Sequence, residues 1–249
     1  GGGGHGGGGH GGGGGGATAA PSARRRRSSA SLAAPRASFA AHVRCAVRVG
    51  SSVWSAERDG CVVVRCAATA EVEERLMTGL HHLVWCLLPL RGRVWCGTES
   101  GVVLLYDAHS RQLLRELPRA HVGGVHCLAA TSRPAGEPRT NLDFVLSGGA
   151  DFTLLMWSDA GERRRQYAGH RGAVRCCLVL GMAIWSCSDD GTIRVWDAAY
   201  GLFGLDTEPC AATLHGHHGA VHALLTMHVT SSSSSSSSST GGGGGGGGG

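Results

Sequence analysis

The chain has 249 residues and a formal net charge of +5, and all 23 residues counted as Lys or Arg are arginines. Without lysine it has no P-loop lysine, no Schiff-base lysine and no strand lysine of the protein-kinase type. Its longest apolar run, Cys176–Trp185, is far shorter than the roughly 20 residues that a transmembrane helix needs, so we expect no membrane span.

Both ends of the chain are of low complexity. Residues 1–40 are rich first in glycine and then in Arg, Ser and Ala, and residues 229–249 are almost entirely Ser and Gly. Such segments have too few apolar side chains to offset the entropy of ordering, so we predict that they are disordered. The run Arg24–Arg27 is interpreted as part of a solvated linker; a transit peptide and a basic localisation or nucleic-acid patch are the alternatives. The predicted folded region is 41–228.

Four turn sequences recur through this region at intervals of about forty residues. They are Asp59-Gly60, Ser100-Gly101, Asp151-Phe152 and Asp190-Gly191. One interval is longer because it contains the segment Thr131–Asn141, which we place in a surface loop. Asp-Gly is typical of a two-residue type I′ hairpin, and this is the turn we predict at Asp190-Gly191. A period near forty indicates a repeat of four-stranded units.

The other landmarks keep the same register. An apolar strand precedes each turn, and another strand begins each unit, at Val43, Val84, Val125 and Val174. A fifth copy of this first strand is predicted at Val221-His222-Ala223.

The best-preserved unit ends in Ser186–Asp197, where a strand, a tight turn and a second strand lead to Trp196-Asp197. Together with the preceding Gly169-His170, this stretch resembles a WD40 repeat. The resemblance implies an all-β fold, a WD40 β-propeller of about four blades plus one extra strand. Because most propellers of this family have seven blades, we expect an incomplete seven-bladed ring.

The resemblance also implies a buried hydrogen-bonded tetrad of His, Ser, Asp and Trp in each blade. Two units match throughout, with His121, Ser147, Asp151 and Trp157 in the third and His170, Ser186, Asp190 and Trp196 in the fourth. The second unit has Cys96, Ser100 and Tyr106 instead and only an approximately placed His81 or His82, and the first has Arg65 and no aligned His. We therefore expect these two blades to be held by packing alone. The tetrads are read as structural rather than as catalytic triads, because they recur and no G-x-S-x-G motif is present.

Four of the ten cysteines share one register position. They are Cys45, Cys86, Cys127 and Cys176, and the fifth copy has Ala223 there. A position that accepts Cys or Ala favours a small buried group over a disulfide or a metal ligand. Reduced thiols predict a cytoplasmic or nuclear protein. We expect no metal and no cofactor, and His215–His218 is interpreted as a turn.

In WD40 proteins, partner contacts come from three register positions on one face. The start of the innermost strand supplies Arg44, Trp85, His126, Arg175 and His222. The position two residues later supplies Ala46, Leu87, Leu128, Cys177 and Leu224. The residue before the hairpin Asp supplies Arg58, Glu99, Ala150 and Asp189. Trp and Arg are typical interface anchors, although Trp85 is equally well explained by strand packing.

The predicted function is therefore a non-catalytic scaffold that binds other proteins. Two alternatives stay open. In the first, the chain is the propeller segment of a larger signalling enzyme and resembles the propellers of inositol-polyphosphate phosphatases. In the second, it associates with RNA, and Arg163–Arg165 is a candidate contact. The sequence does not name the partner.

Overall fold

The computed structural model describes residues 43–78, 83–131, 144–198 and 209–227. Both terminal segments predicted to be disordered, the histidines at 81 and 82 and most of the 131–141 insertion lie outside these ranges. The described residues contain no helix, so none among them has the length and apolar character needed to cross a bilayer.

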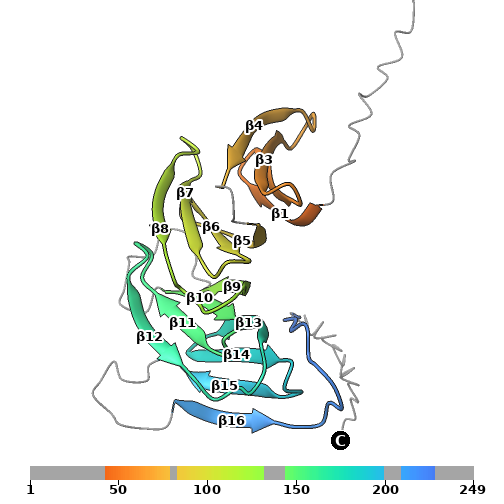
Figure 1. Cartoon of the computed structure of the whole chain (residues 1–249), viewed down its shortest axis with the longest axis vertical. Coiled ribbons are helices and arrows are strands. Elements are labelled where there is room, and N and C mark those ends of the chain that lie inside the picture. The colour runs from red at the N-terminus through yellow and green to blue at the C-terminus, as the bar shows by residue number, and fades with distance from the viewer. Residues whose placement is uncertain (1–42, 79–82, 132–143, 199–208, 228–249) are drawn as a thin grey trace, which may run out of the picture. The chain divides into compact units, whose positions relative to one another are not determined.

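Among the described residues, sixteen strands form four antiparallel sheets of four strands each, and each sheet is called a blade here (Figure 1). Blade 1 contains β1 (Val43–Val49), β2 (Ser52–Glu57), β3 (Cys61–Cys66) and β4 (Val72–Met77). Blade 2 contains β5 (Val84–Leu90), β6 (Arg93–Thr98), β7 (Val103–Asp107) and β8 (Leu113–Leu117). Blade 3 contains β9 (Val125–Ala130), β10 (Val145–Gly149), β11 (Leu154–Trp157) and β12 (Arg163–Tyr167). Blade 4 contains β13 (Val174–Leu180), β14 (Ala183–Ser188), β15 (Ile193–Asp197) and β16 (Cys210–Leu214).

The order within every blade follows the chain, as a meander whose first strand lies at one edge. These first strands lie next to one another, with β1 against β5, β5 against β9, and β9 against β13. The architecture is the predicted all-β propeller fold. Ring closure is not seen among the described residues, because the contacts between blades join blade 1 to blade 2, blade 2 to blade 3 and blade 3 to blade 4, but not blade 4 to blade 1.

The hydrophobic cores lie between successive blades. One core joins blades 1 and 2 around Trp54 and Tyr106, a second joins blades 2 and 3 around Trp95 and Trp157, and a third joins blades 3 and 4. Each blade is therefore stabilised by its neighbour rather than by a core of its own.

A valine at the start of each unit shows how neighbouring blades fit. Val125 and Val174 are fully buried. A Cβ added to Gly97 of the preceding blade would lie 2.7 Å from Cγ1 of Val125, and a Cβ added to Gly148 would lie 2.7 Å from Cγ1 of Val174. Val43 occupies the same register position but is 40% exposed, because no described blade precedes it. A glycine in the preceding blade thus makes room for the valine of the next one.

The cysteine register has the same steric explanation. The cross-strand partners of the four equivalent cysteines are all small: Cys45 faces Ala56, Cys86 faces Gly97, Cys127 faces Gly148, and Cys176 faces Cys187. A Cβ on Gly148 would lie 2.6 Å from Sγ of Cys127. Larger side chains would not fit where the first strands approach one another. All ten cysteines are free thiols.

The predicted type I′ turn at Asp190-Gly191 is wrong. Gly191 has φ +79°, but Asp190 does not have positive φ, and a type I′ turn needs both. Instead the Gly191 N–H donates to the Ser188 carbonyl, closing a tight turn that ends in a left-handed residue. Gly60, Gly101 and Phe152 take the equivalent left-handed position, so only the second residue of each predicted turn pair has positive φ.

The fifth copy at Val221 also differs from its prediction. Residues 219–227 form no strand, since no second strand pairs with them among the described residues. Val221 nevertheless takes the expected position: its side chain is 7% exposed, and its N–H donates to the Ser188 carbonyl at 3.0 Å. The packing of the next unit onto blade 4 is kept without regular strand structure.

Candidate protein-interaction site

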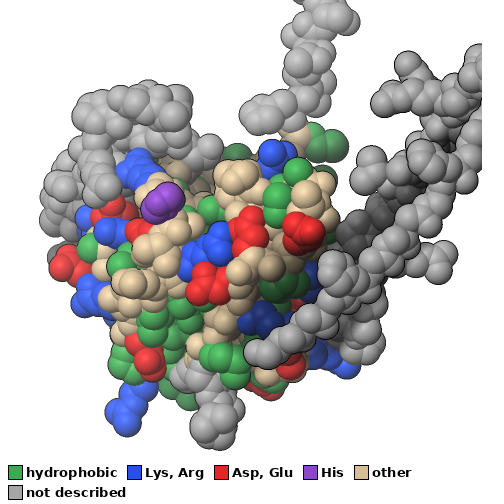
Figure 2. Space-filling model, turned by 90° about the horizontal axis from the view of Figure 1, so that it is seen from above, with side chains coloured by type: hydrophobic (Ala, Val, Ile, Leu, Met, Phe, Trp, Pro, Cys, Tyr) green, Lys and Arg blue, Asp and Glu red, His purple; other side chains and the backbone are tan. Residues whose placement is uncertain are grey.

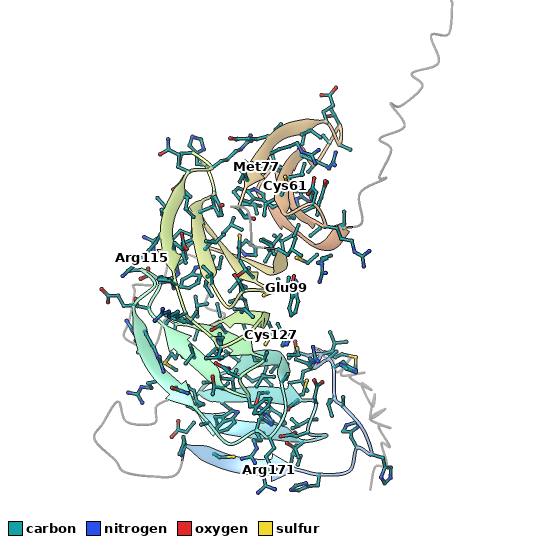
Figure 3. All side chains as sticks on the ribbon, viewed as in Figure 1. Cys61, Met77, Glu99, Arg115, Cys127 and Arg171 are labelled. Carbon is teal, nitrogen blue, oxygen red and sulfur yellow. The ribbon has the colours of Figure 1, made fainter. Side chains whose placement is uncertain are left out.

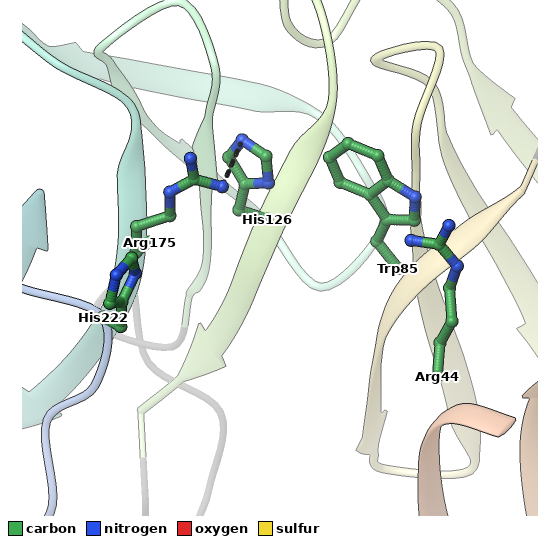
Figure 4. Close-up of a pocket in the computed structure, with 5 residues that line it drawn as sticks. All are labelled: Arg44, Trp85, His126, Arg175 and His222. Atoms are coloured by element: carbon green, nitrogen blue, oxygen red, sulfur yellow. Dashed lines mark hydrogen bonds between the residues drawn. The ribbon is translucent and has the colours of Figure 1, made fainter. Parts of the chain in front are cut away.

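The first of the three predicted register classes converges on one pocket of about 400 Å³ (Figure 4). We call it the five-residue pocket, and its lining residues are Arg44, Trp85, His126, Arg175 and His222. They come from the starts of four different first strands and from the fifth copy. Residues distant in sequence are therefore brought together by the repeat itself.

A β-bulge explains why these side chains reach the pocket. In each blade the pairing register slips around one residue of the first strand, between Val43 and Cys45 in blade 1 and between Val174 and Cys176 in blade 4. The residue skipped by the ladder is Arg44 in blade 1, Trp85 in blade 2, His126 in blade 3 and Arg175 in blade 4. A bulge re-aims the side chain of its extra residue. Four of the five pocket residues are thus set by an irregularity that every described blade repeats, and His222 lies outside the described strands.

The side chains form a continuous row across the pocket. The Arg44 guanidinium carbon lies 5.5 Å from the centre of the Trp85 ring, a cation–π contact. Trp85 stacks on His126, with ring centroids 4.9 Å apart and planes 17° apart. Nη1 of Arg175 lies 3.5 Å from Nε2 of His126. In Figure 4 the row runs from Arg44 through Trp85 and His126 to Arg175, with His222 beside Arg175.

Asp189, from the third register class, holds Arg175 in place. Nε and Nη2 of Arg175 donate to the two carboxylate oxygens at 2.8 and 2.5 Å. This hydrogen bonding lowers the pKa of Asp189 and raises that of Arg175. Burial, and then the charge of Arg175, lower the pKa of His126, so its imidazole is neutral at pH 7 and accepts from Arg175.

The other predicted face residues are not brought into this pocket. Arg58 and Glu99 are exposed at the turns of blades 1 and 2, and neither lines the pocket. Leu87 is 8% exposed and belongs to the core between blades 1 and 2, and Cys177 is 6% exposed in the core of blades 3 and 4. The prediction that Leu87 contacts a partner is therefore corrected. Leu87 and Cys177 lie two residues after the bulge, where the strand is regular again, and their side chains face the neighbouring blade.

The two complete tetrads form hydrogen-bonded chains below this surface. In blade 4 the Trp196 indole N–H donates to Ser186 Oγ at 2.8 Å, Ser186 Oγ lies 2.8 Å from His170 Nε2, and His170 Nδ1 lies 2.8 Å from the Asp190 carboxylate. A neutral His170 with its proton on Nδ1 satisfies every group in this chain. Ser186 is fully buried, which excludes it as a nucleophile for an external substrate.

Blade 3 repeats the arrangement at nearly the same distances. Trp157 donates to Ser147 at 2.9 Å, Ser147 lies 2.8 Å from His121, and His121 lies 2.9 Å from Asp151. Asp151 also accepts from the Val122 backbone N–H at 3.1 Å. The chain thus ties the loop before the blade to its second and third strands.

Acid should weaken blade 3 through Asp151. Burial acts to raise the pKa of this carboxyl, but hydrogen bonds from His121, Val122 and Thr153 outweigh it and lower the pKa to about 2. A lowered carboxyl pKa contributes stability that is present above pH 4 and lost as pH falls toward 2, here about 2 kcal/mol. We expect Asp151→Asn to be less stable than the wild type at pH 7 in urea unfolding. The difference should shrink as pH falls through this window, and a constant difference would contradict the assignment.

Blade 1 replaces the tetrad with a buried ion-pair network, so the prediction that blades 1 and 2 rely on packing alone is wrong. Glu57 has a side chain only 1% exposed and accepts from Arg65 at 3.0 Å and from Arg75 at 3.1 Å. Arg75 also donates to Asp59 at 2.8 Å. Arg65 stands where blades 3 and 4 have tryptophan. Two features of the sequence indicate this network: an Arg stands in place of the Trp, and an acidic residue lies two positions before the hairpin Asp.

Blade 2 uses a smaller set of hydrogen bonds. The fully buried Thr98 hydroxyl donates to the Val102 carbonyl at 2.7 Å and accepts from the Val102 N–H at 3.0 Å, and it lies 3.0 Å from the Ser100 hydroxyl. The turn is thus closed by Thr98 rather than by a carboxylate.

Comparison with known proteins agrees with this architecture. The family model "WD domain, G-beta repeat" matches residues 161–197, which span β12 to β15. The chain is 28% identical over 122 residues to nuclear distribution protein PAC1 of Gibberella zeae, covering 48% of this chain and 25% of that protein. It is 31% identical over 91 residues to a ribosome biogenesis protein WDR12 homolog of Trichoplax adhaerens, covering 34% of this chain and 20% of that protein.

The solved structure of the RRP9 WD40 repeats superimposes with a TM-score of 0.58 at 20% identity. The match covers 73% of this chain and 53% of the solved one. The chain therefore spans a quarter or less of the curated relatives and about half of this structure. Residues 161–197 are therefore a WD40 repeat, and the described part of the chain has the fold of a WD40 β-propeller.

Proposed function

We propose that the chain is a non-catalytic scaffold that binds other proteins in a multiprotein complex through the five-residue pocket. The observation that carries the proposal is the repeated bulge, which turns one residue of each first strand out of the ladder and into a shared pocket. These residues include one Trp and two Arg, the side chains most often found as interface anchors. The blades supply rigidity, and the pocket supplies the contact.

One face of the molecule offers less for a specific contact. Figure 2 shows one face of the molecule on which basic, acidic and apolar side chains are interspersed rather than gathered by type. A mixed surface of this kind favours solubility over recognition. The pocket, by contrast, combines two guanidinium groups with two stacked rings.

We further propose that the protein works in the cytoplasm or the nucleus. The support is its set of ten free cysteines, several of them near one another in the core, since oxidising compartments favour paired thiols. The relatives bear the names of a nuclear distribution protein and a ribosome biogenesis protein, which agrees with this proposal.

Capture of partner proteins tests the proposed function. In a pull-down with the full chain, the double variant Trp85→Ala, Arg175→Ala should lose the proteins that the wild type retains. The matched control is Leu114→Ala, Arg115→Ala on the outer strand β8, where Leu114 is 52% exposed and Arg115 lies on the outer side of the blade (Figure 3).

Thermal melts must accompany the capture assay, because Trp85 also packs on Gly124: a Cβ on that glycine would lie 2.4 Å from the ring. We expect both double variants to melt within a few degrees of the wild type. Capture that survives in a folded pocket variant would show that this face is not the interface.

RNA association is the second candidate function. Three consecutive arginines, Arg163–Arg165, lie on the outer strand β12, and one relative is named for ribosome biogenesis. Binding to RNA would weaken steeply as salt is raised, because phosphate contacts release counterions. The alternative of an attached signalling enzyme stays a prediction about residues outside this chain.

A further inference from the structure

We propose that the five-residue pocket recognises an acidic peptide segment of the partner, with a carboxylate directed to Arg44. This inference rests on the proposed function, because it assigns a chemistry to the same site. Figure 4 shows the two arginines at opposite ends of the Trp85–His126 stack. An acidic side chain of the guest meets Arg44 at one end, whereas Arg175 at the other end is already bound to Asp189.

The uncompensated positive charge of the pocket comes from Arg44, because Asp189 pairs with Arg175. Arg44 is exposed, and no carboxylate of the described residues lies within ion-pair distance of it; its contact is the Trp85 ring. His126 is neutral at pH 7, because burial and the charge of Arg175 lower its pKa. An unpaired guanidinium beside an aromatic ring is a binding group for a carboxylate of another molecule.

The hydrogen-bonding groups of the pocket are mainly donors. The buried indole N–H of Trp85 has no acceptor among the described residues, and the ring nitrogen lies on the Arg44 side of the pocket (Figure 4). The carboxylate of Asp189 lies next to Arg175 and already accepts hydrogen bonds from two nitrogens of that side chain. Groups that only accept hydrogen bonds, as carboxylates do, therefore complement this site better than amides or amines.

The terminal segments of this chain cannot supply such a guest. Residues 1–42 and 228–249 contain no Asp and no Glu, and the first of them contains the run Arg24–Arg27. Charge complementarity thus excludes these two segments as the acidic guest. An acidic segment would also be steered to the pocket by its charge, which speeds association more than it strengthens the final complex.

Fluorescence anisotropy with the full chain tests the chemistry directly. The probe is a short labelled peptide with glutamates spaced by small residues, and its control has each Glu replaced by Gln. We expect the acidic peptide to bind about tenfold more tightly than the control, with an affinity that falls as salt is raised. Equal binding of the two peptides would overturn the inference.

Single variants locate the contact. Arg44→Ala removes an exposed side chain without an ion pair and should weaken acidic-peptide binding about tenfold, whereas Arg44→Lys, which keeps the charge, should recover part of the loss. Arg115→Ala on β8 is the matched control and should bind as the wild type does. If Arg44→Ala binds normally, or if an RNA oligonucleotide displaces the peptide and binds more tightly, the acidic-peptide assignment is wrong.

A competition experiment separates this inference from the proposed function. Excess acidic peptide should release the partner captured by the wild-type chain. If the partner depends on Trp85 and Arg175 but is not released, the pocket is the interface and the acidic chemistry is wrong. If neither the partner nor the peptide depends on these residues, both proposals fail.

Discussion

Replacing Trp196 with alanine is expected to lower the free energy of unfolding by about 3–5 kcal/mol. The side chain is 1% exposed in the core between blades 3 and 4, and it packs edge-on against Tyr167, with ring centroids 5.8 Å apart. Its indole N–H is also the first donor of the blade 4 tetrad, through Ser186. The substitution removes a large packed ring and leaves a buried hydroxyl short of one donor. Urea unfolding at neutral pH measures the loss.

Trp196→Phe separates the two contributions. The phenyl ring keeps much of the packing but lacks the N–H, so this variant should lose about 1–2 kcal/mol. A loss below about 1 kcal/mol for Trp196→Ala would contradict the tetrad as a stabilising element, since core truncations of this size cost more.

Glu57→Ala should destabilise the chain by a similar amount, about 3–5 kcal/mol. The substitution takes away the carboxylate that pairs with Arg65, whose side chain is only 13% exposed. Removing one member of a buried ion pair costs more than the pair itself contributes, because the other charge stays in a poorly solvated place. Thermal and urea unfolding of the variant check this.

Two further variants make the result specific. Arg75→Ala removes the other partner of Glu57, but the Arg75 side chain is 49% exposed and should cost less than about 1 kcal/mol. Replacing both Glu57 and Arg65 with apolar residues of similar size should recover much of the stability lost in Glu57→Ala. Equal losses in Glu57→Ala and Arg75→Ala would mean that the pair is not buried in solution.

The fold was predictable because its signal is repeated. A single Trp196-Asp197 dipeptide is weak evidence, but a valine, a cysteine and a turn recurring at a constant offset leave few alternatives. The same register placed the tetrad residues and the five pocket residues at equivalent positions, and the structure brings each set together. The bulge that aims Arg44 and its counterparts could not be derived from composition; the positions came from the family resemblance.

What the sequence missed depends on contacts between blades or on exact backbone geometry. The family resemblance implied that Leu87 is exposed for partner contacts, but it is buried in the core between blades 1 and 2. Asp190-Gly191 suits a type I′ turn locally, but the strands here are joined by a longer connection with only Gly191 left-handed. Glu57 and Arg65 are not cross-strand partners, since Arg65 pairs with Val53, so their ion pair depends on how the side chains pack. Local patterns do not contain this information, because tertiary packing supplies it.

Site-specific photo-crosslinking tests the central claim most directly. A photoreactive amino acid is placed at His222, an exposed residue of the five-residue pocket, and separately at Leu114 on the outer strand β8. We expect the captured partner to become covalently linked from position 222 and not from position 114. Crosslinking from position 114 alone would contradict it, because the partner would then bind the outer strands and not the pocket.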